Sequence, residues 1–178
     1  MDLASLQKQI KDVSKQLPPV DKWDPNFCGD IDIQIKHDGS WYYMGTPIGR
    51  KPMVKLFSGV LKREGDDYFL VTPVEKVGIQ VADSPFVITQ WHKQDQFLIF
   101  TTQTDEDILV SADNPVILQA DRSTGDLLPY VLVRRNLWAR LHQNVFYQLA
   151  ELGEQGQFES DNHLLVKSAD YIFSLGKL

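Results

Sequence analysis

Residues 77–111 read VGIQVADSPFVITQWHKQDQFLIFTTQTDEDILVS, and this stretch decides the fold class. Runs rich in Val, Ile and Phe alternate here with short polar segments, a pattern typical of antiparallel strands joined by turns. A further strand is expected at residues 116–119, followed by a turn at residues 121–126. The sequence therefore predicts a sheet-rich fold that contains an antiparallel meander.

A hairpin and a helix are predicted before this stretch. In residues 31–43, IDIQIKHDGSWYY, isoleucines alternate with polar residues as in a half-buried strand, and the Asp-Gly pair at 38–39 favours a tight turn. A helix is expected at residues 52–61, because proline is tolerated in the first helical turn and apolar residues follow at helical spacing. Residues 68–71, YFLV, then form another strand.

Two more helices are expected near the ends of the chain. Apolar residues recur every three or four positions in residues 3–17, until two prolines end the pattern. Packing of this helix on the body of the protein or on a second copy is favoured over a membrane-surface role, since its polar face mixes acids with lysines. A further helix is predicted at residues 137–152. Residues 163–166 are expected to form a strand, and residues 171–175 a strand or short helix.

The two halves of the chain resemble each other. The segment around Arg50 and the apolar helix that follows match the segment around Arg135 and its helix, and Val71 in the next strand matches Val166. The sequence therefore predicts an α+β fold of two small pseudo-repeated units, each made of mostly antiparallel sheet plus helix. The expected boundaries are an N-terminal helix at 1–20, a first unit at 21–80 and a second unit at 81–178.

Composition excludes several classes of protein. Hydrophobic residues make up 43% and charged residues 24% of the 178 residues, an ordinary balance for a globular chain. A single cysteine cannot form an internal disulfide, and the charged N-terminus and short apolar runs argue against a signal peptide or a membrane span. The net charge of −6 disfavours broad binding to nucleic acid. A cytoplasmic protein without membrane contact is expected.

No metal or cofactor is predicted. The four histidines lie far apart, and the one near pair of metal-ligand residues, Cys28 with His37, would still need two more ligands for tetrahedral zinc. Phosphate-binding loops of the P-loop and GxGxxG types are absent from the sequence. The segment GTPIGRKP at residues 45–52 could hold a phosphate at a helix start, but a tight turn into a helix is the favoured interpretation.

Cations precede two of the predicted helices. Arg50-Lys51 and Arg134-Arg135 stand at expected helix N-termini, where the helix dipole is already positive and a cation costs about 0.3–1 kcal/mol. One interpretation is recognition of an anion, either a phosphate or a carboxylate on a partner. The other interpretation is pairing with internal acids, for example Glu75 or Asp170. Both interpretations stay open at this point.

Four segments carry a family resemblance: DIDIQIKHDGSWYYMGTPIGR, MVKLFSGVL, LVTPVEKVGIQVADSPF and PYVLVRRNLWARL. They resemble the bacterial family known as domain of unknown function 1285 (DUF1285), from about Gly29 to Leu152. The resemblance implies two small α+β units with a repeated motif, a C-terminal unit similar to a pleckstrin-homology fold, and a ligand cleft between the units. It also implies a role in signalling, and it supplies no activity, substrate or cofactor.

The leading functional hypothesis is a non-enzymatic binding module that holds a protein or a small anionic ligand at the cleft between its units. The predicted ligand-binding residues are Trp41, Arg50, Lys51, Glu75, Arg134 and Arg135. The alternative is an enzyme whose acid–base site is assembled across the two units from Glu75, Asp83 or His142. Specific nucleic-acid binding is a third interpretation, which the arginines favour and the acidic balance disfavours. A homo-oligomer is compatible with all three.

Overall fold

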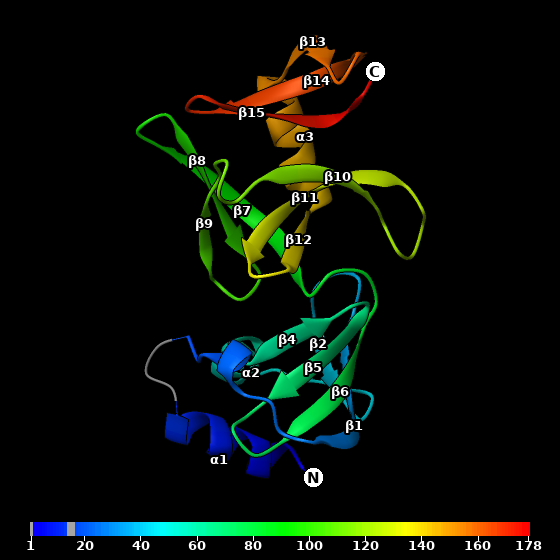
Figure 1. Ribbon diagram of the computed structural model, residues 1–178. Helices are drawn as coiled ribbons and strands as arrows, with labels where there is room; N and C mark the ends of the chain where they lie inside the picture. The colour runs from blue at the N-terminus through cyan, green and yellow to red at the C-terminus, as the bar shows by residue number, and fades with distance from the viewer. Residues whose placement is uncertain (1, 14–16) are drawn as a thin grey trace. The chain divides into compact units, whose positions relative to one another are not determined.

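The computed structural model describes residues 2–13 and 17–178 (Figure 1). It contains two compact units. The first unit comprises Met1–Lys36 and Ser40–Ala82, and the second comprises His37–Gly39 and Asp83–Leu178. Three residues of an early turn thus belong to the second unit. Among the described residues, no helix is both long enough and apolar enough to cross a membrane.

Six strands form one sheet in the first unit: β1 (Phe27–Ile35), β2 (Trp41–Tyr43), β3 (Thr46–Pro47), β4 (Leu61–Glu64), β5 (Asp67–Val71) and β6 (Lys76–Val81). Their order is β3-β2-β1-β6-β5-β4. β1 pairs with β6 in parallel, and the other neighbouring strands of this sheet pair in antiparallel fashion. Ile31, Ile33 and Ile35 are buried at alternate positions along β1, which confirms the predicted strand and its hairpin with β2.

The N-terminal helix packs on the first unit. α1 (Leu3–Val13) buries Leu6 and Ile10, as its apolar stripe predicts. The Gln9 amide donates to Glu75 Oε2 at 2.7 Å and so ties the polar side of the helix to the loop before β6. The predicted continuation of this helix over residues 14–16 lies outside the described residues.

The second helix of this unit is shorter than predicted. α2 (Lys51–Ser58) contains a proline in its first turn and contacts α1. Gly59 ends the helix, and Leu61 already belongs to β4. A short 3-10 helix, η1 (Val20–Lys22), precedes β1.

The second unit contains another six-stranded sheet, made of β7 (Phe86–Gln94), β8 (Phe97–Thr102), β9 (Asp107–Leu109), β10 (Val116–Ala120), β11 (Leu127–Arg134) and β12 (Leu137–Leu141). The strand order is β10-β11-β12-β7-β8-β9, and β12 pairs with β7 in parallel. The predicted meander is confirmed for β7, β8 and β9, which are joined by antiparallel pairs. The strand predicted at residues 77–81 is β6 and belongs to the other sheet.

The helix predicted at residues 137–152 is wrong in its first part. Four of the five residues at 137–141 are buried, and this segment forms β12, a strand between β11 and β7. The helix, α3 (Gln143–Leu152), begins after His142, whose side chain accepts a hydrogen bond from Asn144 N–H as an N-cap. Leu141 and Val145 are four residues apart and both buried, so the strand and the helix together imitate one helical stripe.

The internal repeat is present, but in a register other than the predicted one. Written from its other edge, the second sheet has the order β9-β8-β7-β12-β11-β10, which repeats the order of the first sheet strand for strand. In both sheets the strand that comes first in the sequence pairs in parallel with the strand that comes last: β1 with β6, and β7 with β12. The match of Arg50 with Arg135 is therefore wrong, because Arg50 caps α2 whereas Arg135 lies in the turn between β11 and β12.

A three-stranded sheet closes the second unit beside α3 (Figure 1). Ser168 anchors it, since Ser168 Oγ donates to Val110 O at 2.6 Å and accepts from Leu98 N–H at 2.9 Å. The segment at residues 171–175 is a strand and not a short helix. The pleckstrin-homology shape that the resemblance implies is not confirmed by this arrangement. The strands are β13 (Glu154–Phe158), β14 (Asp161–Ser168) and β15 (Tyr171–Lys177).

Candidate functional site

Two of the predicted ligand-binding residues stabilise the first unit from within. Trp41 is 2% exposed, and its ring stacks on Phe57 at a centroid distance of 6.4 Å. Glu75 accepts the hydrogen bond from Gln9 that holds α1. Both side chains therefore have packing or hydrogen-bonding roles before any ligand is considered.

The start of α2, where Arg50 and Lys51 lie, has few backbone donors for an anion. Pro52 has no N–H, and the N–H groups of Met53 and Val54 donate to Arg50 O at 3.1 and 3.2 Å. A phosphate at a helix N-terminus depends on such groups pointing outward unpaired. The geometry thus favours the tight-turn interpretation of residues 45–52.

Arg134 lies at the end of β11 in the second unit and is paired internally. Its Nη1 donates to Glu106 Oε2 at 2.6 Å, and its guanidinium lies 5.1 Å from the centre of the Phe86 ring. Burial lowers the pKa of Arg134, the charge of Glu106 opposes this effect, and the charge of Arg135 adds to it. Its internal acid partner Glu106 was not among the acids that the sequence suggested. A ligand shared by these arginines and residues of the first unit stays a prediction.

The residues predicted for an acid–base site also have structural partners. His142 caps α3, and Glu75 holds α1. Asp83 accepts a hydrogen bond from Tyr130 OH at 2.8 Å. These contacts do not assemble a shared acid–base pair within either unit.

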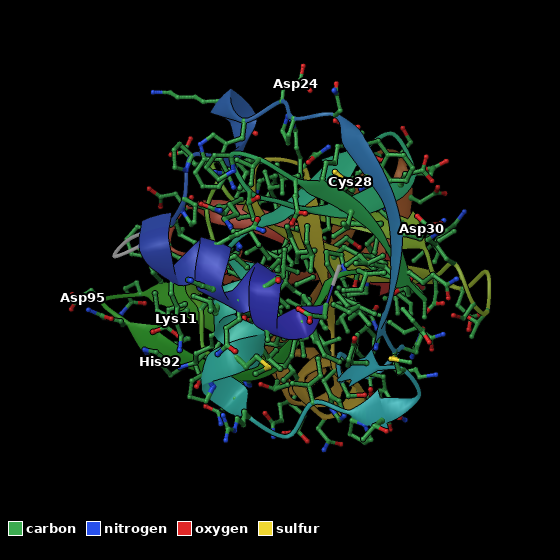
Figure 2. All side chains as sticks on the ribbon, turned by 90° about the horizontal axis from the view of Figure 1, so that it is seen from below. Lys11, Asp24, Cys28, Asp30, His92 and Asp95 are labelled. Carbon is green, nitrogen blue, oxygen red and sulfur yellow. The ribbon has the colours of Figure 1, made fainter. Side chains whose placement is uncertain are left out.

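Cys28 is exposed near the start of β1, close to Asp30 (Figure 2). Its Sγ donates to Asn26 O at 3.2 Å. Cys28 belongs to the first unit and His37 to the second, so no unit contains both members of the near pair noted in the sequence.

An ionic cluster that the sequence does not predict lies in the second unit, and its members other than His37 are buried. We define it as His37, Asp83, Asp121, Tyr130 and Arg140. Asp83 is 4% exposed, Asp121 2% and Arg140 8%. Arg140 Nε lies 3.4 Å from Asp83 Oδ2 and 3.9 Å from Asp121 Oδ2, and His37 Nε2 lies 2.6 Å from Asp121 Oδ2. Two buried carboxylates thus share one guanidinium and one imidazole.

The hydrogen bonds of this cluster determine where His37 carries its proton. A guanidinium can only donate, so Arg140 Nη2, 3.3 Å from His37 Nδ1, makes Nδ1 an acceptor. Nε2 then carries the proton and donates a hydrogen bond to Asp121 Oδ2. Both ring nitrogens are engaged, which leaves neither for general acid–base catalysis in this arrangement.

Burial and hydrogen bonding act in opposite directions on Asp121. Burial raises its pKa, but hydrogen bonds from His37 and from the N–H groups of Ser123 and Thr124 outweigh it, so the pKa is lowered overall. Burial, followed by the hydrogen bond to Asp83, raises the pKa of Tyr130 far above its usual range. At neutral pH, Asp121 is therefore a carboxylate and Tyr130 is a neutral phenol.

The same cluster has the composition of a cation site. His37, Asp83 and Asp121 each offer one ligand atom, and these atoms lie within 4.8 Å of one another. However, the Arg140 guanidinium already supplies the positive charge between the two carboxylates. A metal ion would have to displace this guanidinium, so we assign the cluster a structural role.

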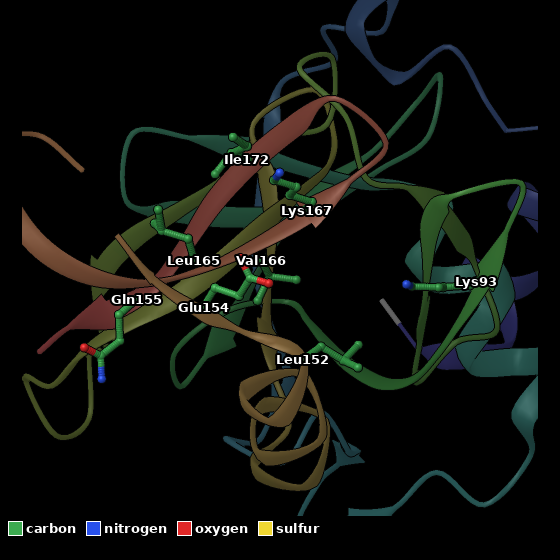
Figure 3. Close-up of a pocket in the computed structure, with 8 residues that line it drawn as sticks. All are labelled: Lys93, Leu152, Glu154, Gln155, Leu165, Val166, Lys167 and Ile172. Carbon is green, nitrogen blue, oxygen red and sulfur yellow. The ribbon is translucent and has the colours of Figure 1, made fainter. Parts of the chain in front are cut away.

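A pocket opens in the second unit between the end of β7, the end of α3 and the three-stranded sheet (Figure 3). Its cavity volume is ≈ 210 Å³, below the roughly 300–1,000 Å³ that is usual for drug-sized ligands. We call it the amphipathic pocket. Its lining residues are Lys93, Leu152, Glu154, Gln155, Leu165, Val166, Lys167 and Ile172.

The charged residues of the amphipathic pocket are open to a ligand. Within the described part of the chain, Lys93, Glu154 and Lys167 have no ion-pair partner within 4.0 Å. Figure 3 shows the Lys93 ammonium pointing toward the other lining residues, whereas the Gln155 amide points away from them. The lining of the pocket thus contains two cations and one anion, all three of them exposed.

Two apolar residues of the pocket are accessible to solvent. Leu152 is 46% exposed and Ile172 is 43% exposed, whereas Val166 in the same lining is 3% exposed. Leu152 continues the stripe of α3 that is otherwise buried, beyond Val145 and Leu149. A ligand with an apolar body would cover side chains that water now contacts.

Family models match both parts of the chain. Residues 18–84 match the model described as domain of unknown function (DUF1285), N-terminal domain. Residues 85–175 match the model described as protein of unknown function (DUF1285), C-terminal domain. The chain belongs to the DUF1285 family.

Solved structures of DUF1285 proteins are similar to this one. A DUF1285 family protein from Silicibacter pomeroyi DSS-3 is 42% identical, with a TM-score of 0.83 over 97% of this chain and 95% of that chain. A DUF1285 family protein from Shewanella baltica OS155 is 30% identical, with a TM-score of 0.56 over 67% of this chain and 90% of that chain. No curated protein matches.

Sequence reasoning predicted none of the residues that line the amphipathic pocket of this DUF1285 protein. They come from β7, α3 and the three strands that follow, and they form no motif with fixed spacing. The one available signal was Leu152, at the end of the apolar stripe of α3. That signal identifies an apolar residue but does not reveal that the residue is half exposed.

Proposed function

We propose that this DUF1285 protein is a non-enzymatic binding module, whose amphipathic pocket takes a small anionic ligand with an apolar body. One observation carries the proposal: two lysines without ion-pair partners among the described residues flank apolar side chains that remain exposed. A ligand carboxylate accepts hydrogen bonds from Lys93 and Lys167. Its apolar body covers Leu152 and Ile172.

The expected affinity is low. Nearly half of Leu152 and Ile172 remains exposed, and full burial of such a side chain contributes about 1.5–3 kcal/mol, so covering each contributes about 1 kcal/mol. Two ion pairs at a solvent-exposed site add roughly 0–1 kcal/mol each. The sum, about 2–4 kcal/mol, corresponds to a dissociation constant on the order of 1–30 mM, a level suited to sensing an abundant small molecule.

The lining of the pocket supports binding without chemistry. Its eight residues include no serine, cysteine or histidine, and within the described residues its one carboxylate, on Glu154, has no hydrogen-bonded nucleophile beside it. Elsewhere in the same unit, His37 has both ring nitrogens engaged. Occupancy of the pocket would be the signal in the signalling role that the family resemblance implies.

The proposal is tested by NMR titration of the ¹⁵N-labelled protein with 4-methylpentanoate, and with 4-methylpentan-1-ol as the neutral control. We expect saturable shifts at β14 and at the end of α3 for the acid, and at least 10-fold weaker binding by the Lys93→Ala, Lys167→Ala double variant. Lys22→Ala, an exposed lysine of the first unit, is the matched control and should bind normally. Equal binding of the acid by the double variant and the wild type would overturn the proposal.

A further inference from the structure

We infer that the ligand of the amphipathic pocket is a zwitterion, which offers an ammonium group to Glu154 as well as a carboxylate to Lys93 and Lys167. The inference rests on the proposed function: it keeps the carboxylate and the apolar body of the proposed ligand and adds an ammonium group. A small α-amino acid with an apolar side chain has this chemistry.

Glu154 is placed among the groups that the ligand would contact. One residue, Gly153, separates it from Leu152, so the turn from α3 into β13 brings an acidic and an apolar side chain to the same pocket. An added Cβ at Gly153 would lie 2.7 Å from Leu164 Cδ1, which means that this turn packs tightly against β14. The position of Glu154 relative to Leu152 is therefore defined by close packing.

The two lysines do not neutralise Glu154. An ion pair requires an N–O distance of at most 4.0 Å, and among the described residues neither lysine meets it with Glu154. The Gln155 amide, another polar group of the lining, points away from the other lining residues (Figure 3). Glu154 is thus the one carboxylate in the lining, and it has no ion-pair partner among the described residues.

A simple carboxylate fits this pocket incompletely. It would satisfy the lysines but would place an apolar group or a like charge against Glu154, and an ionised group that loses water without gaining a partner is destabilised. An ammonium group carries three donors and no acceptor, which is what Glu154 lacks. The apolar side chain of the zwitterion then covers Leu152 and Ile172, and the cavity volume of ≈ 210 Å³ suits a ligand of this small size.

The test compares three ligands that differ by one group each: leucine, 4-methylpentanoate, which lacks the amino group, and 3-methylbutan-1-amine, which lacks the carboxylate. NMR titrations of the wild type should give leucine an affinity about 10-fold higher than that of either fragment. Glu154→Gln should weaken leucine at least 5-fold and leave 4-methylpentanoate unchanged or tighter. Glu151→Gln, an exposed acid of α3 outside the lining, is the matched control and should not change either affinity.

The outcomes separate this inference from the proposal on which it rests. If 4-methylpentanoate binds in a manner that depends on Lys93 and Lys167 but no more weakly than leucine, the proposed function stands and the zwitterion is rejected. The zwitterion is also rejected if Glu154→Gln leaves the affinity for leucine unchanged. If neither ligand shifts the resonances of the pocket, both ideas are overturned.

Discussion

The two six-stranded sheets share one strand order but differ in what is attached to them. In each sheet, two three-stranded meanders meet where the first and last strands pair in parallel. The first sheet carries α2 between its third and fourth strands and is preceded by α1. The second sheet has a short turn at residues 111–114 in place of that helix, and it is followed by α3 and the β13–β15 sheet.

This difference separates the segments that both units share, which form the two sheets, from the segments that only the second unit has, which form the pocket. The shared strand order supplies a sheet in each unit. The ionic cluster joins the turn residue His37 to strands β11 and β12 and to the residues just before β7 and just after β10, and the amphipathic pocket lies where β7 meets the elements that the first unit lacks. The repeat therefore explains the scaffold, and the unshared segments explain the pocket.

The largest effect is expected from the charges on the last strand of each sheet. Arg140 on β12 is buried with two carboxylates, so Arg140→Ala should lower the free energy of unfolding by about 3–5 kcal/mol. Lys76 on β6 pairs with Glu64, which is 40% exposed, so Lys76→Ala should cost about 1 kcal/mol or less. Urea unfolding monitored by tryptophan fluorescence measures both.

The ratio of these two effects is the diagnostic quantity. Similar costs for Arg140→Ala and Lys76→Ala would mean that the buried cluster is hydrated like a surface ion pair. Arg140→Met, which keeps part of the buried volume, separates the loss of charge from the loss of packing. It should be nearly as destabilising as the alanine variant, because Asp83 and Asp121 still lose their cation.

A second prediction concerns the pH dependence that the buried cluster adds. Since the pKa of folded Asp121 lies below its ordinary value of 3.8, its contribution is complete well above pH 3.8 and disappears as the pH falls through the folded pKa. Asp121→Asn should lower the free energy of unfolding by about 1.5–3 kcal/mol at pH 7, because hydrogen bonds to a charged group contribute about that much to stability. This cost should shrink as the pH falls below about 4.

The matched variant in the first unit is Glu64→Gln. The hydrogen bond with Lys76 lowers the pKa of Glu64, but solvent screens this exposed pair. We therefore expect the pH slope of the unfolding free energy to change less in Glu64→Gln than in Asp121→Asn. Equal slopes in the two variants would contradict the burial argument.

The sequence predicted those strands whose burial alternates in an isolated run, and it failed where two elements shared one stripe. The hairpin of β1 and β2 was predictable because isoleucines alternate before an Asp-Gly turn. β12 was mistaken for helix because Leu141 at its end aligns with Val145 of α3. The N-cap role of His142 is the physical boundary between them, and histidine is not among the residues that usually mark one.

The candidate sites were less predictable, for a different reason. The ionic cluster joins residues from a turn, a linker and two strands of the second sheet, and no residue spacing encodes their contact. Arg50 and Arg135 were predicted to occupy equivalent positions before a helix, and this equivalence came from a wrong register of the repeat. Local patterns reveal elements, whereas partners across a sheet depend on strand order.

The smallest predicted effects lie in the first hairpin turn of each sheet. Between β1 and β2 the residue with positive φ is Gly39, at +86°, whereas between β7 and β8 the two residues Asp95 and Gln96 have φ values of 50° and 74°. A residue with a side chain loses about 1–2 kcal/mol of stability when its backbone has a positive φ. Glycine avoids this strain, but it loses more conformational entropy on folding, which offsets part of the gain. Gln96→Gly should therefore stabilise the protein by about 0.5–1 kcal/mol, and Gly39→Ala should destabilise it by about 1 kcal/mol or more, since its Cβ would lie 2.9 Å from Gln103 Nε2.

Gln94→Gly, at the end of β7, is the control and should be destabilising, because glycine in a strand relieves no strain and loses more conformational entropy on folding. The melting temperatures of the three variants distinguish the two turns. A Gln96→Gly protein with a Tm at or below that of the wild type would show that Asp95 and Gln96 do not strain the second turn. The two hairpins would then be equivalent in backbone strain as well as in strand order.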